Sequence, residues 1–243
     1  DVLPEFTEPG DGPRGPATTL IGLAPARSTY AEVQAWIAKK GLSCKDTSPR
    51  ALMADMRDKQ VAKMREAEAK GDADGASGAS WLYRVTEYDK QPGVRLACED
   101  VALDKLGDRE RPAHTGRLLL IFDSKALPLR HIAVQRHYQA TEQAAARADF
   151  LATEAALTAA LGKPTEVRTE VPAEGAEFVM LKPVRRDWKF ADLQGKVSIL
   201  RLNHGLSLFE EVGVPWPVRV GAAPTAVPAP AEATPAAPEK AAP

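Results

Sequence analysis

The stretch from Gly116 to Pro164 constrains the fold of this chain most, because two strand patterns and one long helix pattern follow one another within it. Leu118 to Phe122 is a run of large apolar residues, which is typical of a strand covered on both faces. The turn-forming residues Asp123-Ser124-Lys125 come next. Residues 129–138 then alternate. We therefore predict a hairpin of two long strands.

Alternation along the second strand assigns its side chains to two faces of a sheet. The group that shares a face with the apolar residues consists of Arg130, Ile132, Val134, Arg136 and Tyr138. The group that faces the other way consists of His131, Ala133, Gln135 and His137.

An alanine-rich helix is predicted to follow from about Ala140 to Leu161, since alanine has the highest intrinsic helix propensity. Its buried stripe is expected to include four residues at helical spacing: Ala146, Phe150, Leu157 and Leu161. Gly162 and Pro164 mark the end of the helix.

The remaining elements predict an α+β fold. A capping box at Thr29-Tyr30-Ala31-Glu32 begins a helix that extends to Lys40, and Ser48-Pro49 begins a second helix that extends as far as Lys70. Strands are predicted at 82–88, 94–98, 165–171, 178–181, 187–190, 197–202 and 206–212. We expect two layers, with one or more antiparallel sheets covered by about three helices. The element order is also compatible with two successive helix-plus-four-strand units.

Composition divides the chain into three parts. Residues 1–18 are rich in proline and glycine and predict an irregular N-terminal arm. Residues 19–220 form the α+β domain, with possible sub-units at 19–138 and 139–220. From Ala222 onward, 10 Ala and 6 Pro fill 22 positions, so 221–243 is predicted to be a disordered tail.

Several classes of function find no support in the residues. The net charge is -1, so no basic excess favours binding to nucleic acid. The run from Leu118 to Phe122 is far too short to cross a bilayer. No glycine-rich nucleotide-binding loop is present. His131 and His137 would lie about 20 Å apart along an unbroken strand, too far for one metal ion. We expect no cofactor and no metal.

The chain has two cysteines, Cys44 and Cys98, in separate predicted elements. A disulfide between them would stabilise the fold by about 4 kcal/mol in the chain-entropy description. Such a bond would indicate an oxidising compartment, periplasmic or extracellular. The alternative is two unrelated buried thiols in a cytosolic protein.

A polar sheet face is the remaining candidate for a functional surface. Its expected members are Arg84, Arg95, His131, Gln135 and His137, provided that the strands pair in the predicted way. These residues would contact a partner protein. The alternative is an ordinary solvated sheet face.

Two passages carry a resemblance to known proteins. One runs from Gly22-Leu23 through Ser28 to Gly41, and the other is GRLLLIFDSKALPLRHIAVQR followed by a helix that ends in LGKPTEV. They resemble bacterial envelope α/β modules of the outer-membrane-assembly lipoprotein and beta-lactamase-inhibitor-protein type. The resemblance implies a non-catalytic binding module.

These observations lead to one main hypothesis and two alternatives. The main hypothesis is an exported bacterial accessory protein that binds another envelope or secreted protein, with the tail as spacer or tether. The first alternative is a periplasmic carrier of a small molecule or lipid. The second is an enzyme of an unrecognised class, whose titratable groups the fold would gather in a cleft.

Overall fold

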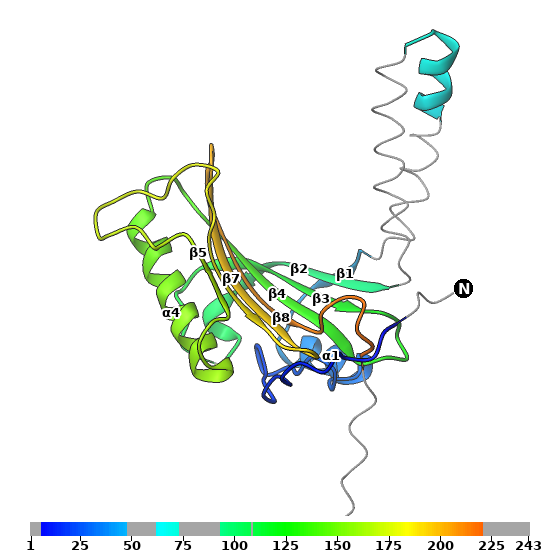
Figure 1. Cartoon of the computed structure of the whole chain (residues 1–243), viewed down its shortest axis with the longest axis horizontal. Helices are drawn as coiled ribbons and strands as arrows, with labels where there is room; N and C mark the ends of the chain where they lie inside the picture. Colours follow the sequence, from blue (N-terminus) through cyan, green and yellow to red (C-terminus); the bar gives the residue numbers. More distant parts are fainter. Residues whose placement is uncertain (1–5, 48–61, 73–92, 108, 221–243) are drawn as a thin grey trace, which may run out of the picture.

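An antiparallel sheet of eight strands forms the centre of the described part of the protein (Figure 1). The computed structural model describes residues 6–47, 62–72, 93–107 and 109–220. The strands are β1 (Cys44–Asp46), β2 (Val94–Ala102), β3 (Thr115–Phe122), β4 (Leu129–Tyr138), β5 (Glu166–Arg168), β6 (Val184–Lys189), β7 (Gln194–Leu202) and β8 (Gly205–Gly213). The helices are α1 (Tyr30–Lys39) and α4 (Gln143–Leu161), and residues 62–69 are also helical. The predicted α+β class is confirmed.

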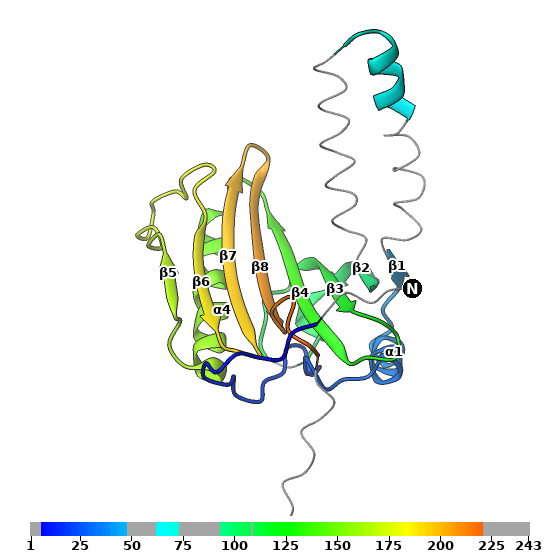
Figure 2. The same cartoon turned by 45° about the vertical axis from the view of Figure 1, so that its right-hand side comes forward.

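The order of strands in the sheet is β1-β2-β3-β4-β8-β7-β6-β5 (Figure 2). Within each half, consecutive strands are antiparallel neighbours, and a helix precedes each half: α1 before β1–β4 and α4 before β5–β8. The halves join where β4 pairs with β8, from His131 opposite Gly213 to Tyr138 opposite Leu206. The two helix-plus-four-strand groups therefore share one sheet.

The predicted hairpin is confirmed as β3 and β4, which pair from Gly116–Arg136 to Phe122–Leu129. Burial in β4 alternates as predicted. Ile132, Val134, Arg136 and Tyr138 are buried, whereas the residues between them are half-buried or exposed. One face of the sheet is therefore covered much more completely than the other.

Helix α4 lies against the sheet over β4, β8 and β7 (Figure 1). All four residues of the predicted stripe, from Ala146 to Leu161, are buried. Gly195 allows close packing, because a side chain at that position would overlap Leu161. The buried Trp188 donates a hydrogen bond from its indole nitrogen to the Gly162 carbonyl oxygen at 2.7 Å, which fixes the end of the helix.

Several bounds differ from the sequence-based expectation, and the strand predicted at 187–190 spans Val184–Lys189. Strand β2 continues past its predicted end at residue 98 to Ala102, through an irregularity between Cys98 and Val101. The strand at 165–171 spans only Glu166–Arg168. The strand at 178–181 is wrong, since only Met180 forms a bridge there, to Arg201. The predicted strand at 82–88, the start of the second helix at Ser48 and the tail 221–243 lie outside the described residues.

The two ends of the described chain meet at Arg130. Thr7 forms a bridge with Val218, and the rings of Phe6 and Trp216 lie edge to face at 5.7 Å. The guanidinium of Arg130 lies 5.5 Å and 5.2 Å from the centres of these two rings. It also donates hydrogen bonds to Asp123 and to the carbonyl oxygen of Val218, at 2.5 and 2.7 Å. Arg130 thus ties both ends to the β3–β4 turn.

The predicted disulfide between Cys44 and Cys98 is present. The two residues are directly opposite each other in the pairing of β1 with β2. The bond therefore fixes the edge strand β1 to the sheet. None of the helices in the described part of the chain has the length and apolar character that a bilayer crossing requires.

Replacing both cysteines by alanine is expected to lower the free energy of unfolding by about 2–4 kcal/mol, since the bond closes a loop with a sequence separation of 54. Urea denaturation of the oxidised protein and of the variant measures the difference. The wild-type protein in reducing agent should match the variant. Equal midpoints for all three samples would contradict the stabilising role.

Candidate functional site

The sheet has one face that no helix of the described chain covers (Figure 2). The strands curve so that this face is concave and α4 lies behind it (Figure 1). We call it the open face. Because residues opposite each other in an antiparallel pair project to the same side, the register identifies its side chains strand by strand.

Four of the five predicted partner-binding residues lie on the open face. Arg95 on β2 is opposite Ile121 on β3, which is opposite His131 on β4. Gln135 and His137 follow on β4 at two-residue spacing, on the same side. Arg84 lies outside the described residues. The structure therefore brings Arg95 and the three β4 residues onto one surface, as the alternation in the sequence predicted.

The centre of the open face is apolar, which the sequence analysis did not predict. The side chains that the register places there are Ala97, Leu119, Ile121, Ala133, Leu200 and Phe209. Leu119, Ile121 and Phe209 are only partly buried. The apolar run from Leu118 to Phe122 predicted a strand covered on both faces, but only its helix-facing residues are fully buried. That run was the one available signal for an apolar centre.

Ion pairs surround this apolar centre. The pairs on the open face are Arg117 Nε–Glu99 at 2.8 Å, Lys196 Nζ–Glu211 at 2.7 Å, Arg185 Nη2–Asp187 at 2.6 Å and Lys189 Nζ–Glu166 at 2.5 Å. Arg168 also contacts Glu166. The opposite charges within each pair largely cancel, so the rim is polar but carries little local net charge.

A pocket of about 120 Å³ lies in the rim between β4, β8, β7 and β6. Its walls include His131, Lys196 and Glu211, with His131 Nε2 at 3.4 Å from a Glu211 carboxylate oxygen. Burial raises the pKa of Glu211, but hydrogen bonds from His131 and Lys196 outweigh it and hold that pKa below its ordinary value. The pocket has room for a polar side chain. Among the described residues, no group of three or more His, Cys, Asp or Glu side chains is arranged to hold a metal ion.

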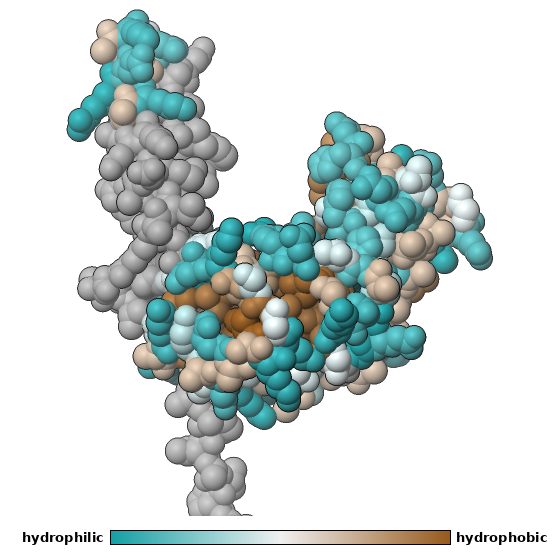
Figure 3. All heavy atoms as spheres, turned by 180° about the vertical axis from the view of Figure 1, so that it is seen from behind, coloured by the Kyte–Doolittle hydropathy of each residue, from teal (hydrophilic) through white to brown (hydrophobic). Residues whose placement is uncertain are grey.

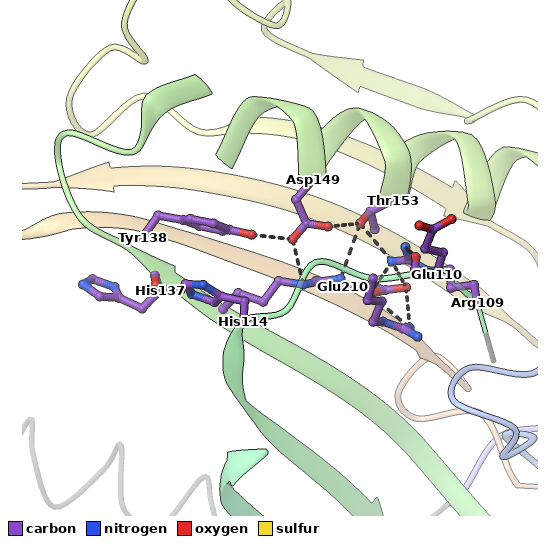
Figure 4. A network of polar contacts seen from close by, with 10 residues as sticks. Arg109, Glu110, His114, His137, Tyr138, Asp149, Thr153 and Glu210 are labelled. Atoms are coloured by element: carbon purple, nitrogen blue, oxygen red, sulfur yellow. Dashed lines mark hydrogen bonds and ion pairs between the residues drawn. The ribbon is translucent and has the colours of Figure 1, made fainter. Parts of the chain in front are cut away.

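A second polar cluster is buried on the opposite face of the sheet, beneath α4 (Figure 4). Arg136 on β4 contacts Asp149 of α4 through Nε at 2.9 Å and Glu210 of β8 through Nη2 at 2.7 Å. Tyr138 donates its hydroxyl proton to Asp149 at 2.8 Å. Arg109 also donates to Glu210, at 2.9 Å. The cluster therefore links β4, β8 and the helix.

Charge controls protonation in this buried cluster. Burial raises the pKa of Glu210, but the charges of Arg136, Arg111 and Arg109 outweigh it and keep the pKa below its ordinary value. Burial and the negative charge of Asp149 raise the pKa of Tyr138. The Glu210 side chain is 1% exposed and its oxygens accept from arginines, so it is not placed to take a proton from a bound molecule. We interpret the cluster as the attachment of α4 to the sheet.

The back of the molecule has a further apolar feature. Figure 3 shows hydrophilic side chains over most of that side, with apolar side chains gathered in a hollow near its centre. This hollow is visible from the direction opposite to Figure 1.

No protein-family model matches the chain, and neither the curated proteins nor the solved structures include a significant match to it. The resemblance to envelope modules therefore stays a prediction from the sequence.

Proposed function

We propose that this protein is a non-catalytic accessory protein that is exported and binds another protein of the cell envelope or a secreted complex through its open face. The observation that carries the proposal is the combination of a partly buried apolar centre with a rim of ion pairs on an uncovered sheet face. Protein interfaces share this arrangement, with an apolar core that desolvates and a polar rim.

The proposal has two further parts, which are export of the protein to an oxidising compartment and tethering by its tail. The Cys44–Cys98 disulfide supports an oxidising compartment, because such bonds are rare where thiols are kept reduced. The resemblance to bacterial envelope modules supports the same compartment. The tail 221–243 would act as a spacer or tether between the domain and the surface or complex on which it works.

Site-specific crosslinking tests the proposed face. A photoreactive phenylalanine analogue in place of Phe209 is expected to give one discrete crosslinked product with envelope extract or culture medium of the source organism. Excess unlabelled protein should compete for that product. The matched control carries the analogue in place of Leu151, an exposed apolar residue on α4. Mass spectrometry identifies the product.

Mutation of the face then tests the captured partner. With the purified partner, Ile121→Asp is expected to weaken binding at least about tenfold, because it places a charge in the apolar core of the interface. Equal crosslinking from positions 209 and 151, or full binding by the Ile121 variant, would refute the open face as the interaction surface.

A small-molecule or lipid carrier is the second candidate, and the apolar hollow in Figure 3 is the observation that favours it. The polar pocket on the open face is smaller than the roughly 300–1,000 Å³ of typical ligand sites. A carrier would therefore use the hollow. Native mass spectrometry of protein purified from its source distinguishes the two candidates, since only a carrier would bring an apolar ligand with it.

A further inference from the structure

Arg95 differs from most of the basic residues on the open face. Its Nε atom is buried and makes no hydrogen bond within the described part of the structure, although the side chain as a whole is partly exposed. The residues 6–47, 62–72, 93–107 and 109–220 also provide no carboxylate within ion-pair distance of it.

The other cations of the face show what Arg95 lacks. Arg117, one strand away on β3, contacts Glu99 at 2.8 Å. On the far half of the sheet, Lys196 and Lys189 have their own glutamates. Lys45 on the edge strand is the other lysine or arginine of the face without such a pair in the described chain, and it is exposed to solvent. Among the described lysines and arginines of the open face, only Arg95 combines partial burial with a buried nitrogen, Nε, that has no acceptor.

The surroundings of Arg95 strengthen any bond that it makes. Its direct neighbour on β3 is Ile121. Ala97 and Leu119 lie on the same face, two residues away along β2 and β3. An apolar environment lowers the local dielectric constant, so a charge-assisted hydrogen bond there is stronger than in water. The planar guanidinium can also bind both oxygens of one carboxylate.

We propose that Arg95 is the anchor for an aspartate or glutamate side chain of the partner protein, seated beside apolar residues that contact Leu119 and Ile121. This inference rests on the proposed function of the open face. Charge complementarity indicates an acid, and the adjoining apolar centre indicates that the acid belongs to a polypeptide with apolar neighbours. A small free anion would leave that centre uncovered.

A random peptide library displayed on phage tests the proposal with the full-length, disulfide-bonded protein as target. The selected peptides are expected to contain Asp or Glu next to apolar residues. One selected peptide is then synthesised in two forms, with its carboxylate and with the corresponding amide. Calorimetry measures the affinity of both forms for wild type, Arg95→Gln and Arg117→Gln.

The amide form is expected to bind wild type about tenfold more weakly than the acid form, and Arg95→Gln should bind the acid form with the same loss. On Arg95→Gln the two forms should differ less than twofold, because the bonded pair is already broken. Arg117→Gln is the matched control, since its cation already has Glu99, and it should retain the discrimination. Arg95→Lys keeps the charge, so its affinity for the acid form should lie between those of wild type and Arg95→Gln. It replaces Arg95→Gln in the test if that variant does not fold.

The outcomes separate this inference from the proposed function. Peptides that lose binding on Ile121→Asp but show no dependence on acid or on Arg95 would overturn the inference and leave the open face as a binding surface. Peptides that bind regardless of Ile121→Asp would count against both. Two other results would overturn the partner assignment: tight binding of free glutamate that Arg95→Gln abolishes, and a wild-type dimer in sedimentation that Arg95→Gln dissociates.

Discussion

Replacing Arg136 by methionine is expected to lower the free energy of unfolding by about 3–5 kcal/mol. Methionine fills most of the volume but leaves the carboxylates of Asp149 and Glu210 without the guanidinium that lies within 2.9 Å of both. The Arg136 side chain is 0% exposed, so water cannot replace the lost contacts. Urea denaturation at pH 7 measures the effect.

The pH dependence of the free energy of unfolding identifies the cause of this destabilisation. The pKa of Glu210 is lower in the folded protein than its ordinary value, so this carboxylate adds stability above its unfolded pKa of about 4.3. That contribution is lost as the pH falls through the folded pKa. Arg136 provides the largest of the charge effects that lower the pKa. The stability that wild type loses as the pH falls from about 5 to about 2 should therefore be smaller in Arg136→Met.

A double variant provides the control. Asp149→Asn removes a stranded charge when Arg136 is already methionine, so Arg136→Met with Asp149→Asn should be more stable than Arg136→Met alone. The interpretation fails if the free energy of unfolding of Arg136→Met is within about 1 kcal/mol of the wild-type value. It also fails if Asp149→Asn lowers the free energy of unfolding of Arg136→Met further.

Phe150→Ala is expected to cost about 3–5 kcal/mol, because the ring is 0% exposed at the centre of the α4–sheet contact. The guanidinium of Arg186, at 5.7 Å from the ring centre, would also lose its aromatic neighbour. Leu151 is the next residue of α4, but it is 37% exposed on the other side of the helix. Leu151→Ala should therefore change stability by about 0.5 kcal/mol at most.

Urea melts of these two neighbours test the packing of α4 without changing its length or charge. Alanine also has the highest helix propensity, so neither substitution weakens the helix itself. Equal losses for Phe150→Ala and Leu151→Ala would show that α4 is packed against the sheet in a different orientation.

The sequence predicted what depends on local spacing. The β3–β4 hairpin, the buried stripe of α4 and the two faces of β4 all follow from periods of two or 3.6 residues. The placement of Arg136 on the buried face was predictable in the same way. That Arg95 shares a face with His131, Gln135 and His137 follows as soon as β2, β3 and β4 are paired as neighbouring strands.

Partners that are distant in the chain were not predictable. Arg109 contacts Glu210 across a sequence separation of 101, and nothing in the local sequence near either residue indicates the other. The apolar centre depends on the pairing of β4 with β8, which brings Phe209 opposite Gln135. The lack of an acceptor for Arg95 could not be predicted, because it depends on which cations the described glutamates and aspartates of the same face contact in the fold.

The meeting of the two ends at Arg130 has a consequence for the topology of the chain. Because Thr7 lies beside Val218, the described backbone forms nearly a closed ring. A short linker between these positions would allow the chain to be opened elsewhere, as in a circular permutant, with the strand order of the sheet retained. A cut in a loop between two strands of the described sheet is therefore expected to leave the concave surface intact.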